Sequence, residues 1–293
     1  MRQEGDHDFS FIVLFSIEAC QTRLEELCAV TSLQVFLQTP KIEDIIAINC
    51  VIKRLRRPLK HGIFLWRLEP PLRIAGISDA SAPNKQSNFA TEGIIVCLAE
   101  DRISKIATDK DDFLIDEMVA LLGGKMHILT GSSQKAKRIS HSTSHAETLS
   151  SAKAIPLSQL IALRLCEPEI VTRRDFKMHR ARPMALLEVQ ESATVPLPVD
   201  SFIDCMDLWE LACGLKGIPQ DKSQILGVLS IREERRCLRL RRLFHIRTKW
   251  MAADQLTKTS GQDSKELYRL VSSGFYDIKD KVRVRQGFGS TTD

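Results

Sequence analysis

The first 70 residues of the chain show the periodicity of helices. One group of apolar positions recurs every three or four residues and comprises Ile17, Cys20, Leu24, Leu27 and Cys28. A second helix is predicted from about Ile42, and Pro58 is expected to close it. Pro70 and Pro71 then mark a boundary, so residues 1–70 are predicted to form a helical segment.

From Leu72 the pattern changes from helical to extended. Residues 72–79 alternate and end in Asp79, residues 93–98 form a continuous apolar run, and a third strand begins at Met126. The polar residues 83–88 are predicted to turn between the first two strands. Because the three strands follow one another through loops, we expect an antiparallel meander. Residues 100–124 are charged and then amphipathic, and are predicted to be an insertion with a short helix.

The second half of the chain alternates helices with strands. A long helix is predicted from Ser144, with Pro156 expected to kink or break it. The segment 167–196 contains prolines and is predicted to be irregular. The remaining predicted elements are a strand over 199–204, helices over 208–215 and 225–240, a strand over 243–248 and a last helix from Ala252. Residues 261–293 are expected to hold a C-terminal helix and a polar tail.

This order of elements predicts an α/β fold. Its centre would be a mixed five-stranded sheet flanked by helices, within residues 71–260, and residues 1–70 would form an N-terminal helical extension. Hydrophobic residues make up 43% of the chain, which supports a full core. The formal net charge of +5 permits a polyanionic partner without requiring one.

Cysteine usage and the N-terminus bear on the compartment. The eight cysteines include no C-x-x-C pair and no histidine at zinc-finger spacing, so a structural zinc site is not expected. The apolar run 9–15 is too short to cross a bilayer and follows an acidic start, unlike a signal peptide. We therefore expect an intracellular protein of the cytoplasm or nucleus, neither secreted nor inserted into a membrane.

Four carboxylates stand at the ends of predicted elements. Asp79 and Asp204 end strands, and Glu147 and Asp254 begin helices. Gathered at one place, four acidic groups would repel one another strongly without cations. Carboxylate oxygens are the ligands that Mg²⁺ prefers, so the set predicts a site for two metal ions.

Each of these acids also has an ordinary structural interpretation. Ser144-x-x-Glu147 has the spacing of a capping box. Asp254 suits the positive end of a helix dipole, and Asp79 suits a turn before a polar loop. Asp207 competes with Asp204, or caps the helix predicted at residue 208.

Local motifs around these acids carry a resemblance. In chain order they are Ser78-Asp79-Ala80-Ser81, Ser132-Ser133-Gln134-Lys135 followed by Lys137-Arg138-Ile139-Ser140, Ala146-Glu147-Thr148-Leu149 and Ala253-Asp254-Gln255-Leu256-Thr257-Lys258. Together they resemble the ribonuclease H domain at the end of the Pol polyprotein of Ty1/Copia-type retrotransposons, over about residues 72–260. Residues 40–70 resemble the connection that follows the reverse transcriptase in that polyprotein. Cys205 departs from the family's preferred Ser, and Gly131 departs from its usual Trp.

The resemblance implies a ribonuclease H-like fold and a metal-dependent enzyme. Such an enzyme hydrolyses the RNA strand of RNA/DNA hybrids with two Mg²⁺ or Mn²⁺ ions. Asp79 would bridge both ions, Glu147 and Asp204 would complete the shell of one, and Asp254 would hold the other. The reverse transcriptase part of a longer polyprotein is an implied partner. The alternatives are an inactive fragment that keeps the fold as a nucleic-acid-binding domain, or a structural domain that braces a polymerase.

Two further sets of residues are candidates for substrate handling. A basic cluster contains Arg232, Arg235, Arg236 and Arg239. It would lie along a nucleic-acid backbone, or else form a solvated face interleaved with Glu233 and Glu234. His245, before the last predicted helix, would assist product release by analogy with some relatives, or would be a strand histidine with a satisfied hydrogen bond.

Overall fold

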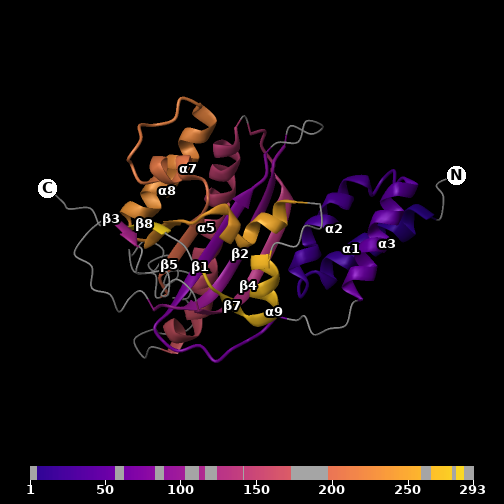
Figure 1. The fold of residues 1–293 in the computed structure, drawn as a ribbon, viewed down its shortest axis with the longest axis horizontal. Coiled ribbons are helices and arrows are strands. Elements are labelled where there is room, and N and C mark those ends of the chain that lie inside the picture. Colours follow the sequence, from indigo (N-terminus) through magenta and orange to yellow (C-terminus); the bar gives the residue numbers. More distant parts are fainter. Residues whose placement is uncertain are drawn as a thin grey trace.

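The protein is described here by a computed structural model. It describes residues 5–56, 63–82, 89–102, 112–115, 124–140, 142–172, 197–258, 265–278 and 282–286. A mixed sheet runs through the centre, with helices on both of its faces and a group of N-terminal helices beside β4 (Figure 1). The predicted turn over 83–88, most of the insertion 100–124, residues 173–196 and the tail 287–293 lie outside these ranges.

Five strands of the sheet are those predicted from the sequence. They are β1 (Leu72–Ala80), β2 (Thr91–Glu100), β4 (Gly124–Lys135), β5 (Val199–Ile203) and β6 (Arg242–His245). β1, β2 and β4 are antiparallel neighbours, as the meander predicted. β5 runs parallel to β1 on its other side, and β6 runs parallel to β5. The C-terminal ends of β1, β5 and β6 therefore meet at one edge of the sheet.

The sheet extends beyond the five predicted strands. Its order is β3-β8-β6-β5-β1-β2-β4-β7, with β3 (Asp112–Ile115), β7 (Phe275–Tyr276) and β8 (Val282–Gln286) added at the edges. β8 lies antiparallel to β6 and β3 to β8. In β8, Val282 and Val284 are buried and Arg283 is exposed, which is the alternation of a strand with one face on the core. The prediction of only a helix and a polar tail after residue 260 is therefore wrong.

Helix α5 (Thr143–Thr172) covers one face of the sheet. The predicted break at Pro156 does not occur, since this residue is exposed while its neighbours on the other side of the helix pack on β1 and β5. The alternative, a kink at Pro156, stays a prediction. The same helix includes residues 167–172, which were predicted to be irregular. α7 (Met206–Ala212) and α8 (Lys222–Arg236) pack beside α5. α8 ends four residues before its predicted end, since Leu238 adopts a left-handed conformation with φ 57°.

The C-terminal part of the chain covers the opposite face of the sheet. There the last predicted helix is two elements, a 3₁₀ helix η5 (Ala252–Thr257) and α9 (Lys265–Ser273). η5 contacts both β1 and β2, and α9 packs against η5. β6 is shorter than predicted, because Thr248 already begins another 3₁₀ helix, η4 (Thr248–Trp250).

The N-terminal helices are α1 (Gly5–Ala19), α2 (Leu27–Leu33) and α3 (Ile42–Leu55), with short 3₁₀ turns η1 (Leu24–Glu26) and η2 (Gln34–Phe36). The apolar positions from Ile17 to Cys28 are thus divided among α1, the following turn, η1 and α2, whereas their spacing had indicated one helical face. A turn after Ala19 separates them, and Arg23 in this turn donates to the carbonyl oxygen of Leu55 at 3.2 Å. Tertiary contacts with α3 outweigh the local periodicity here.

The N-terminal helices share a hydrophobic core with the sheet. Val13 and Ile48 belong to the same buried cluster as Ile77 of β1. At Gly131 of β4 a Cβ atom would lie 2.6 Å from Leu24, so the missing side chain is what lets the N-terminal segment approach. A larger side chain at this position would have to displace Leu24.

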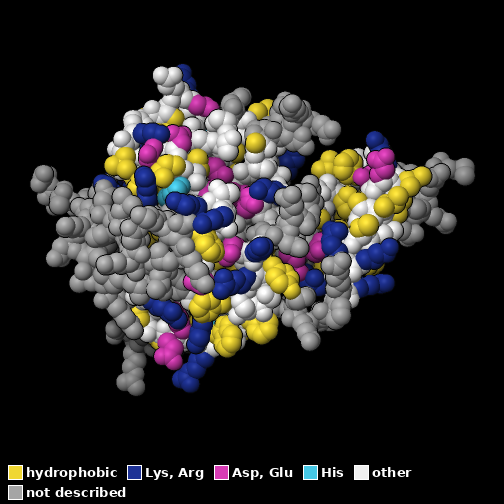
Figure 2. Space-filling view, viewed as in Figure 1, with side chains coloured by type: hydrophobic (Ala, Val, Ile, Leu, Met, Phe, Trp, Pro, Cys, Tyr) yellow, Lys and Arg dark blue, Asp and Glu magenta, His cyan; other side chains and the backbone are white. Residues whose placement is uncertain are grey.

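Figure 2 shows one face of the molecule, on which Lys and Arg side chains are scattered among acidic and apolar ones, with hydrophobic side chains over the N-terminal helices. Exposed residues of those helices include Phe11, Phe15, Ile42 and Ile46. None of the helices in the described ranges has the length and hydrophobicity needed to cross a bilayer.

Candidate metal centre

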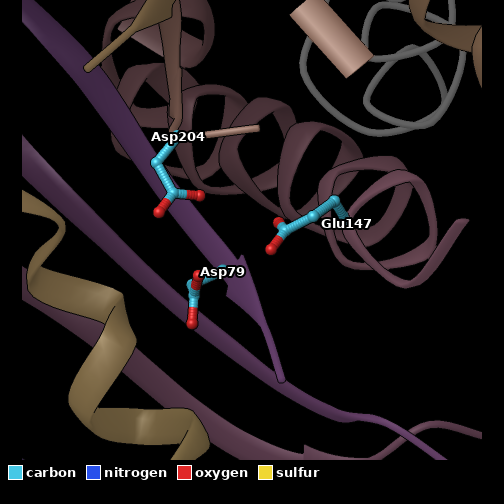
Figure 3. A group of neighbouring side chains, drawn as sticks. All are labelled: Asp79, Glu147 and Asp204. Carbon is cyan, nitrogen blue, oxygen red and sulfur yellow. The ribbon is translucent and has the colours of Figure 1, made fainter. Parts of the chain in front are cut away.

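Three of the four predicted acids converge at the C-terminal edge of the parallel strands. Asp79 is the penultimate residue of β1, and Asp204 directly follows β5, each two residues beyond the paired residues Ile77 and Phe202. Glu147 lies in the first turns of α5, which begins beside this edge. One carboxylate oxygen of each acid lies within 4.8 Å of the others, and the three side chains point toward one another (Figure 3).

The three acids are held in a protein environment that disfavours their charges. Asp79 is 4% exposed and Glu147 is 3% exposed. Burial first, and then the charge of Asp204, raise the pKa of Asp79 to about 7. Burial and the charges of Asp79 and Asp204 raise the pKa of Glu147 to about 10. Burial also raises the pKa of Asp204, as does the charge of Asp254. Without a cation the cluster therefore retains protons at neutral pH.

Few hydrogen-bond donors serve these carboxylates. The Thr257 hydroxyl donates to Asp79 Oδ2 at 2.7 Å, and the Ala80 amide donates to Glu147 Oε1 at 3.1 Å. Glu147 Oε2 is buried and has no hydrogen-bond partner among the described residues. Such an oxygen is costly to bury, and the carboxylate that carries it lies beside two further acids. The three carboxylates could therefore hold a hard divalent cation.

The capping-box interpretation of Glu147 is wrong. Its carboxylate reaches across to the Ala80 amide on β1, while Ser144 donates to Asp207 Oδ2 at 2.7 Å. The side chain that accepts from an amide at this helix end is Ser142, from the His145 N–H. Glu147 is therefore turned away from the end of its own helix and toward the sheet.

The alternatives for the two strand-end acids are also wrong. Asp79 is paired with Gly93 inside β1, so it is not a turn residue. Asp207 lies inside α7, about half exposed, and bonds Ser144 and Lys216. It therefore neither replaces Asp204 in the cluster nor precedes the helix as a cap.

Asp254 stands next to the cluster of three acids. It lies in the first turn of η5, and its charge raises the pKa of both Asp79 and Asp204. Its carboxylate is engaged by Lys258, whose Nζ lies 2.6 Å from Oδ1. The structure thus brings Asp254 within electrostatic range of the site without making it one of the three converging ligands. Its role for a second ion stays a prediction.

His245 ends β6 beside the same edge. Its Nε2 lies 3.0 Å from the main-chain oxygen of Asp204, so the Nε2–H donates to this carbonyl. Burial lowers the pKa of His245, which favours the neutral ring. This contact is the satisfied hydrogen bond of the structural interpretation, and it ties the end of β6 to Asp204. A part in product release stays a prediction.

The four arginines predicted to contact nucleic acid lie on α8 or just after it: Arg232, Arg235, Arg236 and Arg239. Arg232 donates to the main-chain oxygen of Leu211. Arg235, which is buried, donates to that of Ala212. The last two form ion pairs with Glu233 and Glu234, as a solvated face would. Two of these arginines thus connect α8 to α7, and the other two pair with acidic residues of α8. Nucleic-acid binding by the four stays a prediction.

Sequence reasoning missed Thr257 and Lys258 as site residues. Both stand in the motif that contains Asp254, and their spacing was a usable signal. On a helical turn, residues three and four positions apart share a face, so Thr257 and Lys258 lie on the side of Asp254. The Thr257 hydroxyl lies 2.8 Å from the main-chain oxygen of Asp254, which anchors it beside Asp79.

Gly93 allows η5 to carry Thr257 to Asp79. A Cβ atom at Gly93 would lie 2.7 Å from the main-chain oxygen of Ala253 and 2.8 Å from Leu256 Cβ. Because Gly93 is the cross-strand partner of Asp79, this close approach places η5 directly over the lead carboxylate. The glycine is needed here for space, not for an unusual backbone conformation.

We expect Gly93→Ala to destabilise the protein by about 1–3 kcal/mol, because the added methyl group overpacks the β2–η5 contact. The measurement is urea unfolding of the metal-free protein. Gly217→Ala is the matched control, since no heavy atom lies within 4 Å of its Cβ position. Equal unfolding midpoints for the two variants would show that η5 does not depend on the space at Gly93.

Comparisons with known protein families, with curated proteins and with solved structures find no match for this chain.

Proposed function

We propose that this protein is a metal-dependent nuclease with a ribonuclease H-like fold that hydrolyses the RNA strand of RNA/DNA hybrids. The observation that carries the proposal is the convergence of Asp79, Glu147 and Asp204 within 4.8 Å. Those are three of the four positions that the motif resemblance assigns to metal. The strand order supports it further: an antiparallel β1-β2-β4 meander is followed, after α5, by parallel β5 and β6.

The residues present suit Mg²⁺ or Mn²⁺. The unpartnered Oε2 of Glu147 and the raised pKa of all three acids are properties that a bound cation would compensate. Asp79, Glu147 and Asp204 would hold one ion, and Asp79 with Asp254 would hold the second. When bound, the ions stabilise charge on the attacking and leaving oxygens of the phosphodiester. Thr257 orients Asp79 through its hydroxyl, and the Ala80 amide orients Glu147.

The substrate proposal follows from the same resemblance and agrees with the charge of the chain. A net charge of +5 permits a polyanionic partner, and hybrid duplexes are recognised through their backbone and 2′-OH groups rather than their sequence. Association with a reverse transcriptase in a longer polyprotein belongs to this proposal.

The decisive experiment is cleavage of a labelled RNA strand in an RNA/DNA hybrid with Mg²⁺ or Mn²⁺. We expect cutting that is specific to the hybrid and falls at least about a hundredfold in Asp79→Asn, because the bridging charge is lost. Asp207→Asn is the matched control, since this exposed acid lies outside the cluster. A folded wild-type protein that cuts no hybrid with either metal would refute the enzyme and favour an inactive binding or structural domain.

A further inference from the structure

Lys258 places a positive charge beside the proposed metal centre. It follows the last residue of η5, and its Nζ lies 2.6 Å from both carboxylate oxygens of Asp254. The side chain is about half exposed. The ammonium group therefore sits over Asp254 much as a bound cation would, yet it is tethered by a flexible chain that reaches solvent.

The charge of Lys258 acts on more than its direct partner. It lowers the pKa of Asp79 and of Asp204, opposing the effect of Asp254 on the same two acids. Lys258 is thus a counter-charge for Asp79 and Asp204 as well as for Asp254. A divalent ion approaching Asp254 meets this ammonium group first and must compete with it.

The three converging acids accept hydrogen bonds from neutral donors rather than from an ammonium group. Asp79 accepts from Thr257, Glu147 from Ala80 and Asp204 from the Thr248 hydroxyl. Glu147 Oε2 is buried and has no hydrogen-bond partner among the described residues, so it is available to a cation. The site is therefore asymmetric: one cation position is lined by oxygens alone, and the other is already covered by an ammonium group.

We propose that Lys258 controls the occupancy of the second cation position. The site takes one divalent ion on Asp79, Glu147 and Asp204, and takes a second on Asp254 only as the Lys258 ammonium group leaves. This inference rests on the proposed metal centre and adds to it a difference in affinity between the two ions. It makes Lys258 a positioning residue that acts through Asp254.

The test is titration of the intact protein with Mn²⁺, with the free ion followed by electron paramagnetic resonance. Wild-type protein is expected to bind one ion tightly and a second weakly. In Lys258→Met the second ion should bind about tenfold more tightly, the change expected when a unit charge about 6 Å from a divalent ion is removed in solvent-like surroundings. Binding of the first ion should change less.

Three variants make the result specific. Lys258→Arg keeps the charge and should behave as wild type. Lys125→Met removes a lysine that is 34% exposed beside Glu100, at the opposite end of β1 and β2, and should leave both affinities unchanged. Asp254→Asn in the Lys258→Met background should abolish the tightened second site, which assigns that site to Asp254.

The outcomes separate this inference from the proposal on which it rests. Suppose that wild type and both Lys258 variants bind one Mn²⁺ ion tightly, and that Lys258→Met leaves the affinity for the second ion unchanged or weakens it. This result would overturn the role of Lys258 and leave the proposed metal centre in place. No tight ion in the folded wild-type protein, or an equally tight ion in Asp79→Asn, would overturn both. Two equally tight ions in the wild type would overturn the role of Lys258 alone.

Discussion

Metal-free Asp79→Asn protein is expected to be more stable than the metal-free wild type at pH 8, by on the order of 4 kcal/mol. The reason is that the folded state raises the pKa of this carboxyl from 3.8 to about 7, so ionising it costs folding free energy. Asparagine keeps the size and an acceptor for the Thr257 hydroxyl, but carries no charge. The variant thus loses the repulsion while keeping the local packing.

The pH dependence fixes the sign of this effect. A raised pKa means that the folded protein binds a proton more tightly than the unfolded chain does. Protonated Asp79 contributes its full stabilisation to the folded protein below pH 3.8, and this contribution is lost as pH rises through about 7. Glu147, with a pKa of about 10, extends the loss of stability to higher pH. The two proteins should therefore unfold at similar urea concentrations near pH 3.5 and diverge as pH rises.

The measurement is urea unfolding in the presence of a chelator from pH 3.5 to pH 9, repeated with Mg²⁺. Asp207→Asn is the control, and it should lower stability rather than raise it. The reason is that the hydrogen bonds from Lys216 and Ser144 lower the pKa of Asp207, so its charge stabilises the folded protein. Added Mg²⁺ should stabilise the wild type and the control but not Asp79→Asn. A less stable Asp79→Asn protein at pH 8 would mean that the charge of Asp79 is structural rather than held for a cation.

Asp200→Asn is expected to destabilise the protein by about 3–5 kcal/mol, the cost of breaking a buried ion pair from one side. Asp200 is fully buried at the start of β5, where Arg73 donates to it at 3.0 Å and Arg241 donates through two nitrogens at 3.0 and 2.7 Å. Arg73 is itself fully buried against Phe202 and Phe244. Removing the carboxylate would leave its positive charge in an apolar setting.

The same network predicts a loss of stability in acid. Burial alone would raise the pKa of Asp200, but the charges and hydrogen bonds of the surrounding arginines outweigh it and lower that pKa. A lowered pKa contributes stability that is present above the ordinary pKa of 3.8 and is lost as pH falls below it. The difference in unfolding free energy between wild type and Asp200→Asn should therefore shrink as pH falls.

Urea unfolding at pH 7 and in acid tests both statements. Glu233→Gln provides the control, since Glu233 and Arg236 form a solvent-exposed ion pair and its loss should barely move the midpoint. An unfolding midpoint of Asp200→Asn equal to that of the control would show that other groups compensate the buried charge of Arg73.

The central strands and the three converging acids follow from local patterns in the sequence. Alternation and apolar runs locate β1, β2, β4, β5 and β6. β1, β2, β5 and β6 are buried on both faces, and burial alternates along the first half of β4. Asp79 and Asp204 then meet because parallel neighbours end at the same edge of the sheet. Glu147 meets them because α5 begins at that edge.

The remaining features depend on contacts that no local pattern records. β7 has two residues and β3 has four, which is too short for a period to be visible. Pro156 is tolerated because packing on β1 and β5 holds the rest of α5 in place. The relation of Asp254 to the cluster depends on η5 being a 3₁₀ helix pressed against Gly93, and on where Lys258 lies.

The hydrogen bond from Thr257 to Asp79 joins residues that are 178 positions apart in the chain. During synthesis, the three acids have all left the ribosome well before the hydroxyl that orients the first of them has been made. A nascent chain that stops short of η5 therefore carries its acids without the donor to Asp79 and with Gly93 uncovered. Asp79 thus obtains its hydrogen-bond donor late in synthesis, after strands β1 to β6 of the sheet have been made.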